Sequence, residues 1–374
     1  MNDNLIVDLP DMDEHISGAP VYSTIEEDKG KFAIKLAFLG SGQGGCNIAA
    51  QFYKLGYGKV LAINTTEQDL RSVDVPHKFV MVGEGGAGKS PEIGLKAIKK
   101  YREEVLSHCR SSFGEDIEQI IICVGAGGGT GTGTALELVE VAKDYLRSLG
   151  REEAELQKCV GVITTMPQPS EGSKVCQNAH QLLVKLVKLA KAGQLSPLVL
   201  VDNARISKLY PNASVKDFYN VANKNLCAHF SIFNQLAAQD SKYATFDVAD
   251  YRSILRSGLL LFGHTKINSF EKEADISDHI RLNLQKGLFC EGFDLHTAPI
   301  AAGILVASDP VLGILPQTHI DLAFTTLNRL LDTQSMVHRG IYETTKDALF
   351  LYTIIGGLNE PTIRLQELKR VGGL

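Results

Sequence analysis

The sequence predicts an α/β protein with a Rossmann-type first domain, a long central helix and a smaller α/β second domain. Short apolar runs rich in Ile, Val and Leu, such as residues 120–124, alternate with segments of helical periodicity, as buried parallel strands and their connecting helices do. A long stretch of helical periodicity follows in residues 211–240, and strand and helix patterns alternate again in residues 241–374. A chain of 374 residues can bury two full cores.

Composition limits the classes of function that we consider. The net charge of −5 argues against broad nucleic-acid binding through the chain's own surface, so any DNA contact would go through a partner. The seven cysteines are scattered and form no C-x-x-C pair, which is typical of a reducing cytosol and argues against a disulfide framework or a zinc site. No segment approaches the roughly 18 apolar residues of a membrane span, and no secretory signal is evident. We therefore expect a cytoplasmic protein without a membrane partner.

The chain begins with an acidic segment, which is followed by the first predicted strand. Residues 1–30 contain many Asp and Glu residues with little periodicity and predict a solvated arm. Residues 32–39 predict a buried strand, and the next segment, residues 40–47 (G-S-G-Q-G-G-C-N), contains the dinucleotide fingerprint G-x-G-x-x-G. The acidic ribose ligand expected about 20 residues further on is missing, because the next strand, residues 60–63, ends in Asn64-Thr65-Thr66. An NAD-binding enzyme stays an alternative.

A second glycine-rich pattern is found in residues 83–90. Their sequence, G-E-G-G-A-G-K-S, fits the P-loop pattern G-x-x-x-x-G-K-[ST], and residues 198–202 resemble the acidic strand that accompanies a P-loop. Against this interpretation, Pro91 pushes Ser90 toward an extended backbone and removes an N–H group where a P-loop helix needs its first turn. A P-loop NTPase is therefore the rival interpretation of this segment.

The motif around which the chain is organised is residues 125–135, with the sequence G-A-G-G-G-T-G-T-G-T-A. It lies between a predicted strand and a predicted amphipathic helix, which argues against a flexible linker. Glycines allow the backbone to approach a ligand closely, and successive N–H groups at a helix N-terminus bind anions. Thr130, Thr132 and Thr134 add hydroxyl groups that can donate to phosphate oxygens.

Residues 127–133 of this motif, G-G-G-T-G-T-G, resemble the phosphate-binding signature of the tubulin/FtsZ superfamily of filament-forming GTPases. The resemblance extends over about residues 31–360 and implies a tubulin/FtsZ-like fold that binds GTP or GDP. Short strings, among them V-D-N-A at residues 201–204 and F-D at residues 246–247, are most similar to the TubZ type of plasmids and phages.

The resemblance divides the chain into domains. It implies a GTP-binding domain in residues 31–210, after the acidic arm, and a central helix in residues 211–240. A C-terminal domain would follow in residues 241–374 and include an acidic catalytic loop. We expect the mixed-charge tail, residues 362–370, to form a helix packed on this domain.

The resemblance also implies which residues contact the phosphates and the ribose. Residues 86–88 correspond to the loop that faces the γ-phosphate, and Lys89 adds a positive charge beside it. Glu171 lies where a carboxylate accepts the ribose hydroxyls, in a loop of residues 167–174. Asn203 lies where the family recognises the guanine edge.

Tyr219 and Asn223 complete the expected base site. They lie four residues apart on one helix face, so the ring can stack on a purine while the amide hydrogen-bonds to its edge. The alternative is an exposed Tyr and Asn without a ligand. The full set of expected nucleotide contacts is Gly42, Gln43, Gly44, Asn47, Asn64, Gly86, Ala87, Gly88, Lys89, Gly127, Gly128, Gly129, Thr130, Gly131, Thr132, Glu171, Asn203, Tyr219 and Asn223.

Asp247 and Asp250 match the acidic positions of a loop that, in this superfamily, enters the nucleotide site of the next subunit. Two carboxylates three residues apart at a helix start can orient a water for in-line attack on the γ-phosphate. Asp247 can equally be the N-cap of the helix with Asp250 in its first turn, and the two roles are compatible. Phosphoryl transfer implies Mg²⁺, with few protein ligands expected.

A site divided between two subunits makes hydrolysis depend on head-to-tail assembly, and such a contact does not close on itself but yields a filament. The resemblance therefore predicts a GTP-hydrolysing cytoskeletal protein whose partners are other copies of itself and a DNA-binding adaptor, used in plasmid or phage DNA segregation. The alternative within the same fold is an FtsZ-like cell-division filament.

Overall fold

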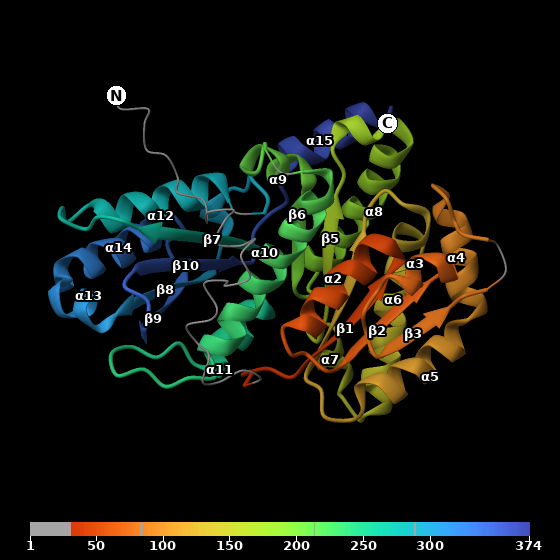
Figure 1. Ribbon diagram of the computed structural model, residues 1–374, viewed down its shortest axis with the longest axis horizontal. Coiled ribbons are helices and arrows are strands. Elements are labelled where there is room, and N and C mark those ends of the chain that lie inside the picture. Colours follow the sequence, from red (N-terminus) through yellow and green to blue (C-terminus); the bar gives the residue numbers. More distant parts are fainter. Residues whose placement is uncertain (1–30, 83–84, 213, 288) are drawn as a thin grey trace. The chain divides into compact units, whose positions relative to one another are not determined.

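The computed structural model describes residues 31–82, 85–212, 214–287 and 289–374. The acidic arm predicted for residues 1–30 and Gly83 of the P-loop pattern lie outside the described residues. The described part of the chain forms two compact units, whose helices and strands are labelled in Figure 1. The larger unit comprises residues 34–228, 255–259 and 362–374, and the smaller unit comprises residues 31–33, 229–254 and 260–361.

The compact units divide the chain differently from the predicted domains: residues 31–33 belong to the smaller unit, and the boundary between residues 228 and 229 falls inside the predicted central helix, residues 211–240. Residues 255–259 and the last helix, α15 (Thr362–Val371), belong to the larger unit, although both lie in the predicted C-terminal domain, residues 241–374. The tail does form the expected packed helix, but Leu365 and Leu368 are buried within the larger unit. An amphipathic helix pattern predicts that a face is buried, without identifying the surface that covers it.

A parallel sheet forms the centre of the larger unit. Its strands have the order β3-β2-β1-β4-β5-β6 and all pair in parallel. The strands are β1 (Leu36–Ser41), β2 (Val60–Asn64), β3 (His77–Val80), β4 (Gln119–Gly125), β5 (Val160–Met166) and β6 (Leu198–Asp202). All except the edge strand β3 are almost fully buried, which explains their continuous apolar runs. The order reverses between β1 and β4, and ligands of such sheets bind outside the carboxyl ends of the strands at this reversal.

Helices connect the strands of the larger unit, as the alternation of patterns predicts (Figure 1). They are α2 (Gly42–Lys54), α3 (Glu67–Arg71), α4 (Pro91–Lys100), α5 (Arg102–Phe113), α6 (Gly129–Ser148), α7 (Glu153–Leu156), α8 (Ser173–Lys191), α9 (Asn203–Leu209) and the part of α10 (Val215–Leu236) up to residue 228. The long helix predicted within residues 211–240 is thus α10. Among the described residues, no helix is both long and apolar enough to span a bilayer.

The smaller unit is a second α/β arrangement with a mixed sheet. Its strands have the order β7-β10-β8-β9, in which β10 is antiparallel to both neighbours and β8 is parallel to β9. The elements are α11 (Val248–Leu255), β7 (Leu259–Ile267), α12 (Asp275–Lys286), η3 (Leu295–Thr297), β8 (Ile300–Ser308), α13 (Asp309–Ile314), α14 (Gln317–Arg329), β9 (Met336–Thr344) and β10 (Leu349–Gly356). The strand and helix alternation predicted for this region is confirmed, with β7 extending five residues beyond the predicted strand at residues 258–262.

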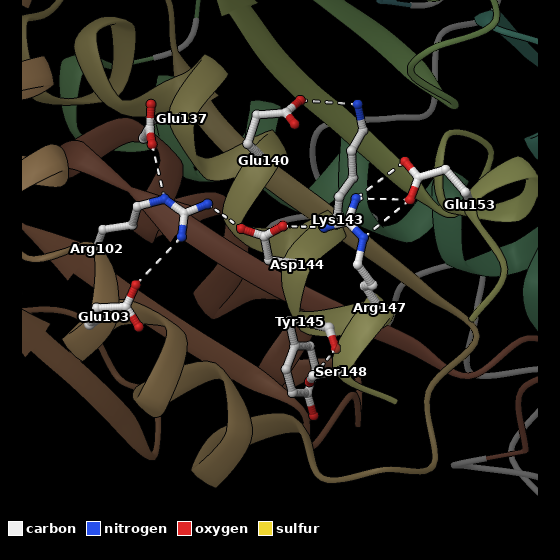
Figure 2. A network of polar contacts seen from close by, with 10 residues as sticks. All are labelled: Arg102, Glu103, Glu137, Glu140, Lys143, Asp144, Tyr145, Arg147, Ser148 and Glu153. Carbon is white, nitrogen blue, oxygen red and sulfur yellow. Dashed lines mark hydrogen bonds and ion pairs between the residues drawn. The ribbon is translucent and has the colours of Figure 1, made fainter. Parts of the chain in front are cut away.

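A charged network connects α5, α6 and α7 on the surface of the larger unit (Figure 2). Arg102 contacts Glu137 at 3.1 Å and also pairs with Asp144. Asp144 in turn pairs with Arg147, which contacts Glu153 of α7 at 3.0 Å. Ion pairs as exposed as these contribute at most about 1 kcal/mol each to folding stability. We therefore infer that the main effect of the network is to fix the relative orientation of the three helices.

Close backbone contact fixes the two helices that follow the glycine-rich segments. A Cβ atom added to Gly45 of α2 would lie 2.0 Å from the carbonyl oxygen of Cys123 in β4. A Cβ atom added to Gly133 of α6 would lie 2.1 Å from the carbonyl oxygen of Pro91 in α4. Neither approach leaves room for a side chain, so glycine is required at both positions.

We predict that Gly133→Ala lowers the free energy of unfolding by about 1–3 kcal/mol, because the atoms it would strike are backbone atoms of α4 that cannot rotate away. Gly58→Ala is the matched control, because a Cβ at Gly58 meets nothing within 4 Å. Urea denaturation of the two variants measures the difference. Equal stability of both variants would contradict the close contact between α4 and α6.

Candidate functional site

The first glycine-rich segment and the segment 125–135 meet at the reversal of the strand order. β1 leads directly into α2 at Gly42, and β4 leads into the loop before α6. A Cβ atom on Gly42 would lie 2.9 Å from the backbone nitrogen of Gly131. Behind this contact, the buried hydroxyls of Ser41 and Thr134 are hydrogen-bonded at 2.7 Å. The structure therefore brings together two segments that are about 90 residues apart in the sequence, as the Rossmann-type interpretation expects.

The segment between β4 and α6, which we call the phosphate loop, presents a helix N-terminus. Gly127 has a φ of +107°, a conformation that favours glycine, and Gly128 is the N-cap of α6. Among the described residues, no N-cap side chain bonds to this helix; the N–H of Gly129 donates to the carbonyl of Gly88, and the N–H groups that follow it in the first turn face the place where an anion can bind. The Oγ1 atom of Thr132 accepts the N–H of Gly127 at 2.8 Å and thereby holds the loop in shape. The predicted anion site thus has the required backbone geometry.

The hydroxyl of Thr130 is part of a connection to the loop after β2. Its Oγ1 atom lies 2.7 Å from Oγ1 of Thr65, and both side chains are buried. Asn64, beside Thr65, accepts the N–H of Thr65 and donates to Asp69, and its contact with the nucleotide stays a prediction. Thr65 is therefore a residue of this site that the sequence interpretation missed. Its apolar-strand context gave no signal beyond its position at a strand end.

Residues 86–89 form a third loop, which hydrogen-bonds to the phosphate loop. The carbonyl of Gly88 accepts the N–H of Gly129 at 2.9 Å. A Cβ on Gly86, whose φ is +111°, would lie 2.7 Å from Cγ2 of Thr66. Ala87 is buried here. The predicted γ-phosphate loop is therefore in direct contact with the phosphate loop.

The start of α4 opposes the P-loop interpretation. Ser90 has an extended backbone, with a φ of −107° and a ψ of 104°, and Pro91 is the first helical residue. A P-loop helix would already have begun around the Lys-Ser pair of the motif. Pro91 instead stands at the helical position where a missing N–H costs least.

Asn178 of α8 hydrogen-bonds to two of these loops. This residue was not predicted from the sequence. Its buried amide nitrogen donates to the carbonyl oxygens of Lys89 at 2.9 Å and of Gly127 at 3.1 Å. The first bond holds the end of the γ-phosphate loop and the second holds the phosphate loop. A single Asn within the helical pattern of α8 gives no sequence signal for this role.

The predicted ribose loop is a short turn before α8. Residues 169–171 form the 3-10 helix η2, and the carboxylate of Glu171 accepts the N–H of Gln168 at 2.7 Å. Glu171 is exposed, and its negative charge affects the ionisation of Tyr219 of α10. Partial burial raises the pKa of Tyr219, and the negative charge of Glu171 raises that pKa further.

The predicted base-recognition residues lie at the end of β6 and on α10. Asn203, the first residue of α9, is 8% exposed, whereas Tyr219 is 53% exposed. Asn223 is half-buried one turn after Tyr219. An exposed ring and an amide one helical turn away can provide a stacking surface and an edge contact to a planar base.

The acidic loop lies in the smaller unit, and its two carboxylates bond to each other's backbone. Oδ1 of Asp247 accepts the N–H of Asp250 at 2.9 Å, and Oδ2 of Asp250 accepts the N–H of Asp247 at 3.2 Å. Asp247 therefore is the N-cap of α11, the structural alternative considered for it. The catalytic role of both carboxylates stays a prediction.

Strand β9 holds this loop through two residues that the sequence interpretation missed. Nδ1 of His338 lies 2.8 Å from Oδ1 of Asp250. The hydroxyl of Tyr342 accepts the N–H of Phe246 at 2.9 Å and donates to its carbonyl at 3.1 Å. Burial raises the pKa of Tyr342 to about 12, so this hydroxyl stays protonated at neutral pH. The acidic loop is thus held by β9 at Phe246, directly before Asp247, and at Asp250.

The predicted site residues fall into two groups. All predicted nucleotide contacts belong to the larger unit, and Asp247 and Asp250 belong to the smaller unit. Within the described residues, no group of three or more His, Cys, Asp or Glu side chains could hold a metal ion.

Comparison with known proteins shows what the larger unit is similar to. Residues 35–211 match the family model described as Tubulin/FtsZ family, GTPase domain. The tubulin-like protein TubZ of Bacillus cereus is 25% identical over 271 residues, which are 67% of this chain and 59% of that relative. The match thus spans less than two thirds of the relative's length.

Two solved structures are similar over nearly the whole chain. The GTPγS-form protofilament of TubZ from Bacillus thuringiensis serovar israelensis has a TM-score of 0.81 at 20% identity and covers 94% of this chain and 95% of that chain. The helical model of the two-stranded TubZ-Bt filament has a TM-score of 0.80 at 19% identity and covers 96% of this chain and 92% of that chain. These similarities confirm the predicted tubulin/FtsZ-like fold class.

We predict that Thr130→Ala combined with Thr132→Ala weakens guanine-nucleotide binding by about tenfold or more, which corresponds to about 1.4 kcal/mol. The change removes the bond that shapes the phosphate loop and two hydroxyls near its N–H groups. Thr130→Ser combined with Thr132→Ser keeps both hydroxyls and should bind nearly normally. Calorimetric titration with GDP compares them, and equal affinity of the Ala and Ser variants would contradict the role of the hydroxyls.

Proposed function

We propose that this protein binds and hydrolyses GTP and polymerises head to tail into dynamic filaments, because residues 35–211 match the family model of the tubulin/FtsZ GTPase domain. The observation that carries the proposal is the meeting of three glycine-containing loops at the carboxyl ends of β1 and β4. A triphosphate needs several N–H donors converging on one place, and three adjoining loops can supply them.

In this proposal the phosphate loop binds the α- and β-phosphates and the loop 86–89 faces the γ-phosphate. Lys89 places a positive charge beside that phosphate, and Gly42 to Gly44 complete the enclosure from the side of α2. Glu171 accepts the ribose hydroxyls. Asn203 and Asn223 hydrogen-bond to guanine while Tyr219 stacks on it, which supports a preference for GTP and GDP over adenine nucleotides.

The residues near the γ-phosphate loop fit a Mg²⁺ ion that is bound mainly by phosphates and water. Among the described residues, the buried Oγ1 atom of Thr66 has no hydrogen-bond partner, and the γ-phosphate loop lies beside its methyl group. We propose that this hydroxyl, with those of Thr65 and Thr130, faces the ion's water shell. When bound, the ion neutralises charge that develops on the phosphates.

Hydrolysis in this proposal uses the acidic loop of a neighbouring copy. The two carboxylates have different bonding: both oxygens of Asp250 have partners, whereas only Oδ1 of Asp247 has one among the described residues. Asp247 is also exposed. We therefore assign to Asp247 the orientation of the attacking water and to Asp250, with His338, the positioning of Asp247.

A filament follows if the hydrolytic site is divided between two copies in this way. A site completed by the opposite end of another copy creates a heterologous contact that propagates without closing. The similarity to protofilament and filament structures of TubZ supports this assembly. Nucleotide hydrolysis at each contact would then control the turnover of the filament.

For the cellular role we propose segregation of plasmid or phage DNA in the cytoplasm, through a DNA-binding adaptor and without direct nucleic-acid contact. The sequence similarity to TubZ and the net charge of −5 support this role. An FtsZ-like cell-division filament is the alternative. Co-sedimentation of the filaments with an adaptor and its DNA site would distinguish the two roles.

Electron microscopy of the purified chain, combined with pelleting, tests the proposed assembly. We expect filaments with GTP or a slowly hydrolysed analogue and rapid loss of them after GTP is consumed. Phosphate release should rise steeply with protein concentration, because isolated copies lack the acidic loop of a neighbour. Hydrolysis at full rate in dilute, unassembled protein would overturn the shared site.

We predict that Asp247→Ala leaves GTP binding intact, lowers hydrolysis by at least about 100-fold and gives long-lived filaments. Because Asp247 caps α11, the Ala variant should also lose about 1 kcal/mol of stability. Asp247→Asn is the matched control, since its amide oxygen keeps the cap but its charge is lost. Normal hydrolysis by a stable Asn variant would remove the catalytic assignment.

A further inference from the structure

The last helix of the chain places a buried arginine between two segments of the nucleotide site. Arg364 of α15 has a side chain that is 8% exposed. Its Nε atom lies 2.9 Å from Oδ2 of Asp202, and a terminal nitrogen donates to the carbonyl oxygen of Pro167. The other terminal nitrogen contacts Glu367 of the same helix at 2.8 Å. All three nitrogens of the guanidinium are therefore engaged.

Both partners outside α15 lie close in sequence to residues assigned to the nucleotide. Asp202 is followed by Asn203, and its Oδ1 atom accepts the N–H of Ala204, so one carboxylate caps α9 and binds Arg364 at the same time. Pro167 is followed by the turn that contains Glu171. Arg364 thus joins the base-recognition segment, 162 residues away in sequence, to the ribose loop, 197 residues away.

The helix that carries Arg364 is firmly placed. α15 packs against α8, the helix that begins directly after the ribose loop (Figure 1). A Cβ atom on Gly372 would lie 2.8 Å from Cα of Gln177 in α8, so the end of the helix touches the α8 backbone. The backbone that carries Arg364 is therefore held in place by α8.

Loss of Arg364 would leave two buried acceptors without their donor. The side chain of Asp202 is only 5% exposed, and desolvation raises the pKa of its carboxyl although Arg364 opposes the shift. A buried carboxylate that loses its cation moves toward water or gains a proton. Either change would displace the N-terminus of α9 and the ribose loop. Lysine cannot replace both contacts, because it lacks the planar fork of donors.

We propose that Arg364 is a positioning residue for the ribose and base end of the nucleotide site, which makes nucleotide recognition depend on the C-terminal helix. This inference rests on the proposed binding of guanine nucleotides. It concerns recognition of ribose and base specifically, because neither Asp202 nor Pro167 belongs to the phosphate-binding loops.

The test compares Arg364→Ala and Arg364→Lys with Arg370→Ala, a change at an exposed position of the same helix. Calorimetric titration with GDP, 2′-deoxy-GDP and ADP measures affinity and selectivity. We expect Arg364→Ala to weaken GDP binding about tenfold or more and Arg364→Lys to weaken it less. The factor by which wild type prefers GDP to 2′-deoxy-GDP should shrink in both Arg364 variants, because Glu171 is no longer held at the ribose. Arg370→Ala should match wild type.

Thermal unfolding without nucleotide shows which variants are folded. If Arg364→Ala does not fold, Arg364→Lys is used for the comparison with wild type. Wild-type affinity and selectivity in a folded Arg364 variant would overturn the inference. An equal loss for GDP and 2′-deoxy-GDP would also overturn it, because a general loss of structure would have that effect. A wild-type protein that does not prefer GDP to ADP would instead overturn the proposed function itself.

Discussion

The structure of the larger unit depends on contacts between backbones that leave no space for side chains. At Gly45 an added methyl would lie 2.0 Å from the carbonyl oxygen of Cys123, and at Gly129 it would lie 2.6 Å from that of Ala87. The first contact places α2 directly against β4, and the second places the loop 86–89 against the start of α6, beside the phosphate loop. The surface they present is therefore made of N–H groups and small side chains, which suits a densely charged anion.

The parts of the molecule that the sequence predicted are those encoded by neighbouring residues. Apolar runs identified the buried strands, and glycines between strand and helix patterns identified the loops. The contacts that hold these loops were not predicted, because their partners are distant in sequence. Asn178 is 89 residues from Lys89, and Arg364 is 162 residues from Asp202. A single Asn or Arg within a helical pattern is indistinguishable from a solvated one until the fold is known.

Contacts between residues distant in sequence also explain why the predicted domains and the compact units differ at the end of the chain. Residues 362–374 follow the last strand of the smaller unit, so their position in the sequence suggested one continuous C-terminal domain. Their side chains instead bury against the larger unit, where Arg364 satisfies a carboxylate that would otherwise be buried alone. The Arg364–Asp202 pair and the buried side chains of Leu365 and Leu368 together attach the end of the chain to the larger unit.

The acidic loop illustrates how one set of hydrogen bonds can serve both stability and chemistry. Capping fixes Asp247 through Oδ1 alone, and a carboxylate has a second oxygen that can still accept a proton or a water. Asp250 has its oxygens bound to the backbone of Asp247 and to His338. A group that must orient water needs a fixed position and an available oxygen, and Asp247 has both. Its role as an N-cap therefore supports its assignment to hydrolysis, because the cap supplies the fixed geometry that orientation of a water requires.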